Sequence, residues 1–326
     1  MKIIILLLLI IPFSIYAKER WELFRFNFYF ENDIFSATDS QYSSGEKFNW
    51  IYKVENPDSR IYNLLFLNYE DIDIYTSFSM VNQIYTPADL EATRLLIYDR
   101  PYAGWTYLEG AIHKSSNSHL RSLYLQIGTV GPNSHAEEIQ NTIHKLIGND
   151  LAMGWDNQIK NEIGINLRYV HKWRLEPRIY HSLESAFIPY TEVDLGNIST
   201  QAIIGSAVRF GWNIPKDFGV STLDMGGEVG IPINSEYKKM LLSKWSFSIN
   251  LSLAGSAVLH DIRLDGNTFK ESHHVEKEPF IFYAGYGFSL RYKKFTLEYL
   301  KNINTRKFTL ERNTHGVGTV VISWMF

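Results

Sequence analysis

The sequence contains no cysteine among its 326 residues, so no disulfide framework can stabilise the fold. It also has no basic excess, because the formal net charge of −3 leaves no electrostatic footprint for nucleic acid. The mean hydropathy of −0.17 excludes a bundle of membrane helices. The G-x-S-x-G nucleophile elbow, the H-E-x-x-H zinc motif and Cys/His clusters are missing as well, which excludes the enzyme classes that depend on them.

Aromatic side chains are abundant instead. With 20 Tyr, 20 Phe and 8 Trp the chain is 15% aromatic, which is typical of a β-barrel with aromatic girdles. Apolar and other residues alternate along many segments, as in the run that contains Phe24, Phe26, Phe28 and Phe30. The chain ends in another alternating segment that finishes with Phe326, which is similar to the assembly signal of outer-membrane barrels.

Twelve segments carry this alternation, and an even number is what bacterial barrels contain. We therefore predict an all-β fold: a twelve-stranded antiparallel transmembrane β-barrel with one short helix in an extracellular loop. A soluble β-sandwich is the alternative, and it would need two inner faces with a turn about every 8–12 residues. The expected strands are 23–31, 44–54, 73–82, 104–114, 119–129, 160–171, 175–188, 199–211, 244–259, 279–292, 295–303 and 315–326.

The amino-terminus predicts export. Lys2 precedes a short apolar run, residues 3–11, and the small residue Ala17 stands at the expected cleavage position. The run is too short to span a bilayer as a helix, although a retained membrane anchor is the alternative. We expect a signal peptide at 1–17 and an outer-membrane barrel at 18–326.

Three long loops should share one side of the barrel. Both ends of such a barrel lie in the periplasm, so we expect the active-site loops 32–43, 83–103 and 130–159 to face outside. The third loop contains the one clear helix, with a capping box at Ser134 and Glu137 and a terminal Gly148. Its apolar face needs a partner, and the outer barrel wall is the expected one.

Two polar side chains on this helix are candidates for chemistry. Gln140 and His144 are four residues apart, so both project from the side that should meet the barrel. An imidazole titrates near neutrality and can take a proton from water. A structural or solvated histidine is the alternative, but the expected nearness of Asn32 and Asp33 favours catalysis.

The same loops offer ligands for a hard cation. Asp33 and Asp150 carry carboxylates that suit calcium, although no D-x-D-x-D-G loop is present and solvated surface carboxylates are the alternative. Asp99 and Arg100 precede Pro101, which holds the residue before it extended. This triplet fits a structural role in pinning the loop as well as a functional one.

Residues spread over the first half of the chain form one combined pattern. It consists of Glu31-Asn32-Asp33, Thr38-Asp39, Tyr42-Ser43-Ser44-Gly45, Tyr85-Thr86-Pro87, Asp99-Arg100-Pro101-Tyr102-Ala103-Gly104-Trp105, Gly131-Pro132, Glu138, Gln140, His144, Gly148, Trp155 and Gln158. The combination resembles the lipid A 3′-O-deacylase family of outer-membrane barrels. The motifs cover residues 23–160, and the strand pattern continues to the end of the chain.

The resemblance implies a twelve-stranded barrel and a calcium-dependent esterase that removes the 3′-linked acyloxyacyl chain from lipid A of lipopolysaccharide. It implies His144 as the base that activates water, with Gln140, Asn32, Asp33 and Ser43 as its catalytic partners. The site would lie at the outer rim, between the barrel wall and the loop helix. Lipopolysaccharide and outer-membrane lipids are the expected partners of a monomer.

The chain departs from the family pattern at three points. Ser43 replaces a threonine, Asp150 replaces a glutamate, and a family lysine in the second outer loop has no match. We expect Arg94 or Arg100 to contact the substrate phosphates in place of that lysine. A phospholipase-like barrel and a non-enzymatic lipopolysaccharide-binding barrel or pore remain alternatives, and a lumen open to small molecules would favour the pore.

Overall fold

The computed structural model describes residues 19–33, 41–58, 60–65, 72–180, 183–219, 222–223, 230–233, 245–311 and 315–326. The expected signal peptide and the Thr38-Asp39 motif lie outside these residues.

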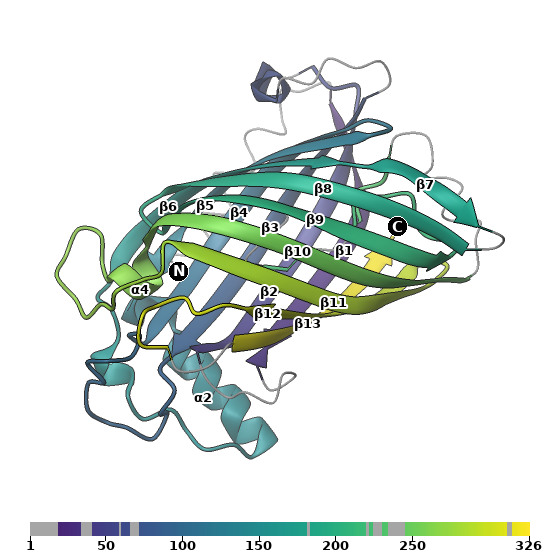
Figure 1. Ribbon diagram of the computed structural model, residues 1–326. Helices are drawn as coiled ribbons and strands as arrows, with labels where there is room; N and C mark the ends of the chain where they lie inside the picture. The colour runs from purple at the N-terminus through teal and green to yellow at the C-terminus, as the bar shows by residue number, and fades with distance from the viewer. Residues whose placement is uncertain are drawn as a thin grey trace.

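The described chain forms a closed antiparallel β-barrel (Figure 1). Closure comes from β1 pairing with β13 and from β6 pairing with β8, so every wall strand has two neighbours and no edge remains. The strands are β1 (Arg20–Asn32), β2 (Gln41–Glu55), β3 (Asp73–Thr86), β4 (Ala103–Ser115), β5 (His119–Val130), β6 (Glu162–Trp173), β7 (Leu175–Tyr180), β8 (Leu183–Gly196), β9 (Ser199–Trp212), β10 (Trp245–Asp261), β11 (Phe280–Tyr292), β12 (Phe295–Asn304) and β13 (His315–Met325).

The wall contains twelve strands, as predicted, because β7 extends β6 past Arg174 instead of adding a thirteenth position. The expected strand 175–188 is wrong in its bounds: Tyr180 pairs with Leu183, so the chain reverses after Tyr180. The reason is that β8 offers one continuous ladder, first to β6 and then to β7. Alternation alone does not show where such a long ribbon folds back.

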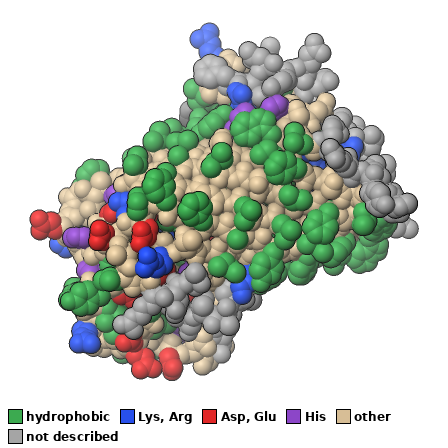
Figure 2. Space-filling view, in the orientation of Figure 1, with side chains coloured by type: hydrophobic (Ala, Val, Ile, Leu, Met, Phe, Trp, Pro, Cys, Tyr) green, Lys and Arg blue, Asp and Glu red, His purple; other side chains and the backbone are tan. Residues whose placement is uncertain are grey.

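The outer face of the strands is apolar, as the alternation predicted. Figure 2 shows hydrophobic side chains over the barrel wall, while acidic and basic side chains gather at the end that carries the helices. A lipid-facing wall explains why so many large apolar groups are exposed. Exposed outward residues include Phe48, Met80, Leu108, Leu125, Ile165, Phe247, Phe282 and Phe288.

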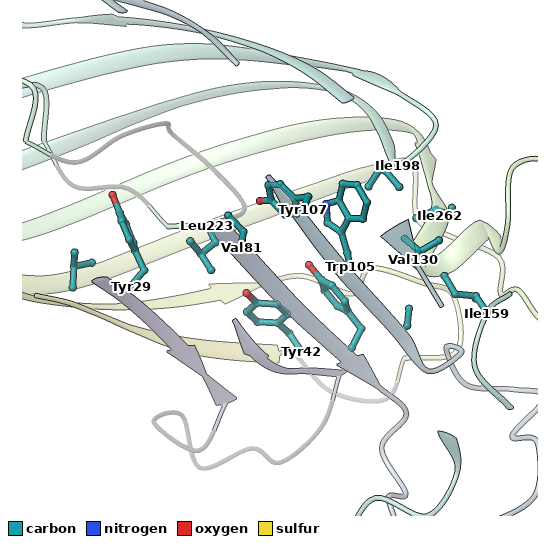
Figure 3. Packing of buried hydrophobic residues seen from close by; sticks show 13 residues of the cluster. Tyr29, Tyr42, Val81, Trp105, Tyr107, Val130, Ile159, Ile198, Leu223 and Ile262 are labelled. Carbon is teal, nitrogen blue, oxygen red and sulfur yellow. The ribbon is translucent and has the colours of Figure 1, made fainter. Parts of the chain in front are cut away.

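The lumen is filled with polar and aromatic side chains. Lys47 of β2 forms an ion pair with Glu109 of β4 at 2.8 Å, and Gln126 of β5 donates to the same carboxylate at 2.8 Å. Aromatic residues cluster between this network and one end of the barrel, where Trp105 and Tyr107 stack at 4.8 Å (Figure 3). The interior is therefore a packed core.

The long connection between β9 and β10 also enters the lumen. We call its described residues, 214–219, 222–223 and 230–233, the plug. Arg209 on the inner face of β9 binds the carboxylate of Asp217, and Ser115 of β4 donates to the Pro232 carbonyl at 2.6 Å. The Leu223 amide donates to Glu31 at 2.9 Å, near the far end of β1. Local sequence pattern does not show that a loop turns inward, so the plug is seen only in the structure.

The short helices lie at one end of the barrel, which we call the helix end (Figure 1). They are α2 (Ala136–Ile147), α4 (Ile262–Asp265), η4 (Pro132–Ser134) and η5 (Trp155–Asn157), while η3 (Arg60–Leu64) follows β2 at the opposite end. The connections 87–102 and 131–161 also belong to the helix end, since each follows a strand that runs towards it. Among the described residues, no helix combines the length and apolarity needed to span a bilayer.

Candidate active site

Helix α2 packs on the outer wall of the barrel, as the sequence predicted. Thr106, on the outward face of β4, donates to the Ser134 carbonyl at 2.7 Å just before the helix. Gly104 makes this approach possible, because a Cβ there would lie only 2.3 Å from the Ala136 side chain. On β3 the outward Ile84 is fully buried in the same cluster as Ala136.

The amino-terminal end of α2 differs from the prediction, whereas its carboxyl-terminal end agrees with it. The expected capping box is wrong: Ser134 closes η4, and the N-cap is His135, in a left-handed conformation and without a side-chain cap hydrogen bond. The Ser134 hydroxyl accepts from the Ala136 amide at 3.4 Å and not from the Glu137 amide that a capping box requires. Ser134 is held against the barrel wall instead, so tertiary packing overrides the local motif. The predicted terminal Gly148 is confirmed, with φ of 77°.

Gln140 lies at the interface between α2 and the wall. Its side-chain oxygen accepts a hydrogen bond from the Trp155 indole at 2.9 Å, and Trp155 packs on Tyr102 with ring centroids 4.9 Å apart. Burial in this cluster raises the pKa of Tyr102 to about 12. The Gln140 side-chain nitrogen is buried without a hydrogen-bond partner in the described structure. The two N–H groups of this amide are thus left to bind something else.

His144 lies one turn further along on the same side. Only 7% of it is exposed, so His144 faces the wall as predicted, whereas Leu146, which helical spacing assigns to the packed apolar face, is 81% exposed, and that part of the prediction is wrong. Its Nδ1 contacts the Asp150 backbone carbonyl at 2.5 Å. A carbonyl only accepts, so Nδ1 carries the proton and Nε2 keeps its lone pair when the ring is neutral. This arrangement is the one that a general base needs.

The outward faces of β1, β2 and β3 bear a polar patch at the helix end. Asn32 is opposite Ser44, and Glu46 is opposite Asn82. Directly opposed residues in a sheet point to the same face with Cβ atoms about 4.5–5.5 Å apart, so these four form one contiguous group. Asn82 also donates to Thr106 at 2.6 Å, which connects the patch to the wall position beneath α2.

Asp33 and Ser43 lie at the strand ends beside this patch. Asp33 follows β1 directly and is 1% exposed. Ser43 occupies an irregularity in the β2–β3 ladder, and its hydroxyl is 2.7 Å from that of Thr86. The structure therefore gathers Asn32, Asp33 and Ser43 at neighbouring strand ends. Their catalytic roles stay predictions.

The two arginines expected to contact substrate differ sharply. Arg94 is exposed in the connection before β4. Arg100 is buried over the ring of Tyr85, at 4.8 Å from its centroid, with Arg263 over the same ring. Burial lowers the pKa of Arg100 despite the opposing effect of Asp261. Because Asp99 also accepts from the Ala88 amide at 2.8 Å, this loop fits the structural alternative.

Sequence reasoning missed Glu46 and Asn82. The signal was present for Glu46: it shares the outward face of β2 with Phe48 and Trp50, where a carboxylate is costly and marks function. The alternation rule counts the apolar residues of a face and gives no weight to a single charged residue among them, such as Glu46. Asn82 carries no such signal, because an amide close to a strand end is common.

The oxygen atoms of the patch suit a hard cation. No group of three or more His, Cys, Asp or Glu side chains in the described part of the chain could hold a metal. Calcium also accepts amide, hydroxyl and backbone oxygens, however. The Glu46 carboxylate, the Asn82 amide oxygen and the Ser44 hydroxyl are all buried without a hydrogen bond of standard geometry to described residues. The donor set therefore fits a calcium ion.

Comparison with known proteins places the chain in a family. A profile described as "Outer membrane protein LpxR" matches residues 3–326. The structure of LpxR from Salmonella typhimurium superposes with a TM-score of 0.73 at 16% identity, over 93% of this chain and 100% of that chain. The β domain of the Bordetella autotransporter Brka gives 0.43 at 6% identity over 93% and 96%, which is too remote to support an argument. A search of curated proteins found no match.

Proposed function

This chain belongs to the LpxR family of outer-membrane proteins, and from that premise we propose that it is a calcium-dependent lipid A deacylase. The reaction is hydrolysis of the ester that links the 3′ acyloxyacyl chain to lipid A in lipopolysaccharide. The helix end faces outside in this proposal, so that the site meets the lipopolysaccharide leaflet. The active species is a monomer in this proposal, because α2 packs on the wall of its own chain.

The observation that carries the proposal is the position of His144. It lies on the lipid-facing side of the barrel with Nδ1 fixed by the Asp150 carbonyl and Nε2 available. A base buried in the lumen would have no access to a membrane lipid. A base between α2 and the outer wall is next to the leaflet that contains the substrate.

In the mechanism, Nε2 of His144 takes a proton from water as the water oxygen attacks the ester carbonyl carbon. The free Gln140 amide donor is placed one turn away to orient the water or the oxyanion. Collapse of the tetrahedral intermediate breaks the bond to the sugar oxygen, which receives the proton from His144. Asp33 and the oxygen atoms of the outward patch would hold calcium, which would supply charge stabilisation of the oxyanion.

The pore alternative is disfavoured by the lumen. The plug, the Lys47–Glu109 network and the aromatic cluster occupy it along its length. At the helix end, Arg263 stacks on Tyr85 and donates to its hydroxyl at 2.6 Å. We expect no steady conductance from the purified protein in planar bilayers.

The deciding experiment is mass spectrometry of lipid A from cells with and without the protein. Loss of the 3′ acyloxyacyl mass in a calcium-dependent manner supports the proposal. Full activity in excess EDTA would remove the cation from the mechanism. Release of fatty acid from phospholipids, with lipid A intact, would instead identify a phospholipase.

A further inference from the structure

Glu46 places a carboxylate on the outward face of β2, where a membrane barrel normally has apolar side chains. Its outward neighbour Phe48 is 43% exposed, as expected for contact with lipid. A charged group on this face is destabilising unless something compensates it. Lys47, the adjacent residue, points the other way and is already bound to Glu109 in the lumen.

The described structure offers Glu46 no basic partner. Neither carboxylate oxygen has a hydrogen bond of standard geometry, although both are buried. Ser44, two residues earlier on the same face, lies beside it, and its own hydroxyl is equally without such a bond. A buried anion in this position is compensated either by a bound cation or by a proton.

A second, independent observation favours the cation. Asn82, directly opposite Glu46, is only 8% exposed, and its side-chain oxygen has no hydrogen-bond partner among the described residues. Its nitrogen donates to Thr106, which turns the oxygen away from that contact and leaves it as an acceptor. A protonated Glu46 could donate to the Asn82 oxygen but would leave the Ser44 oxygen with no acceptor role, whereas a calcium ion coordinates the Glu46, Asn82 and Ser44 oxygens together.

The carboxylate of Asp150, the other acidic residue near His144, does not serve as the ligand of the cation. Asp150 is exposed at the end of α2, and it is its backbone carbonyl that binds His144. We propose that Glu46, with the Asn82 amide oxygen and the Ser44 hydroxyl, binds the calcium ion on the outer wall, and that the Asp150 carboxylate does not. The inference rests on the proposed function for what the ion does there, but its test measures binding without substrate.

Calcium binding should be measured by titration calorimetry on the full chain, refolded in detergent free of lipopolysaccharide, with calcium chloride as the probe. Glu46→Gln is expected to weaken the calcium Kd at least tenfold, because the anionic ligand is lost while size and amide polarity are kept. The matched controls are Asp150→Asn and Glu137→Gln on the exposed side of α2. Both are expected to bind calcium within about threefold of wild type, as exposed carboxylates contribute little.

Unchanged binding by Glu46→Gln, or a tenfold loss in Asp150→Asn, would overturn the inference. If Glu46→Gln fails to refold, Asn82→Asp is the deciding variant. A second carboxylate opposite Glu46 should tighten calcium binding at least threefold. Unchanged or weaker binding by Asn82→Asp would contradict the inference. Lipid A hydrolysis is assayed in parallel. If Glu46→Gln hydrolyses lipid A and binds calcium as the wild type does, this inference is wrong and the proposed function stands. If calcium binding depends on Glu46 but the wild-type protein does not hydrolyse lipid A, the proposed function is wrong and this inference stands.

Discussion

Charged side chains on the two faces of β2 have opposite surroundings. Lys47 points into the lumen and pairs with Glu109, whose carboxylate also accepts from Ser79 at 3.0 Å and from Gln126. Its neighbour Glu46 points outward beneath the helix end, without a described partner of standard geometry. The lumenal network is satisfied and stabilises the barrel, whereas the outer patch keeps polar atoms available. The unsatisfied polar atoms of this outward patch therefore indicate a binding site.

The largest effect is expected on the outer side. His144→Ala, or His144→Asn, should lower lipid A hydrolysis by about 10²–10⁴, since a general base contributes that much to the rate. The assay is mass spectrometry of released acyl chains, and heat-modifiable gel migration reports the folded barrel. Near wild-type release by a folded mutant would make His144 structural.

Two matched substitutions distinguish the two faces of β2 by their effect on the free energy of unfolding of the barrel. Glu109→Gln leaves Lys47 buried without its anion, so unfolding should become easier by about 3–5 kcal/mol. Glu46→Gln removes an uncompensated carboxylate and should leave stability in the absence of calcium unchanged or improved. The measurement is the urea midpoint in detergent. Equal losses in both variants would contradict the distinction between the faces.

The plug gives the lumen an acid sensitivity of its own. Burial raises the pKa of Asp217, but Arg209 and Arg174 outweigh it and hold the pKa below the ordinary 3.8. The stabilisation is therefore present above about pH 4 and is lost as the pH falls through the depressed value. Wild-type heat stability should drop in that acid range, and Asp217→Asn should lower stability at neutral pH and flatten the drop.

The smallest effect is expected at the exposed arginine. Arg94→Ala should raise KM for lipid A about two- to fivefold at constant kcat, because an exposed charge contributes roughly 0.2–1 kcal/mol. Arg100→Ala should instead lower the urea midpoint, since Arg100 packs on Tyr85. Kinetics with purified lipid A and the same urea titration distinguish the two. A KM effect confined to Arg100→Ala would place the phosphate contact there.

The sequence by itself determined the barrel. Strict alternation has a period of two, so it assigned the inner and outer faces of most strands, and twelve such segments determined the size of the closed wall. It also placed Gln140 and His144 on the buried side of α2, because spacing along a helix is a local property.

Only the tertiary structure decided where the strand after β6 folds back, that the plug enters the lumen, and that Ser134 packs on Gly104 instead of forming the expected capping box. It also decided that Arg100 is buried, that the Asp150 carbonyl and not its carboxylate meets His144, and that Glu46 lies opposite Asn82. Each of these depends on which strands are neighbours in the closed sheet. Register joins residues far apart in the chain, and no local periodicity records it.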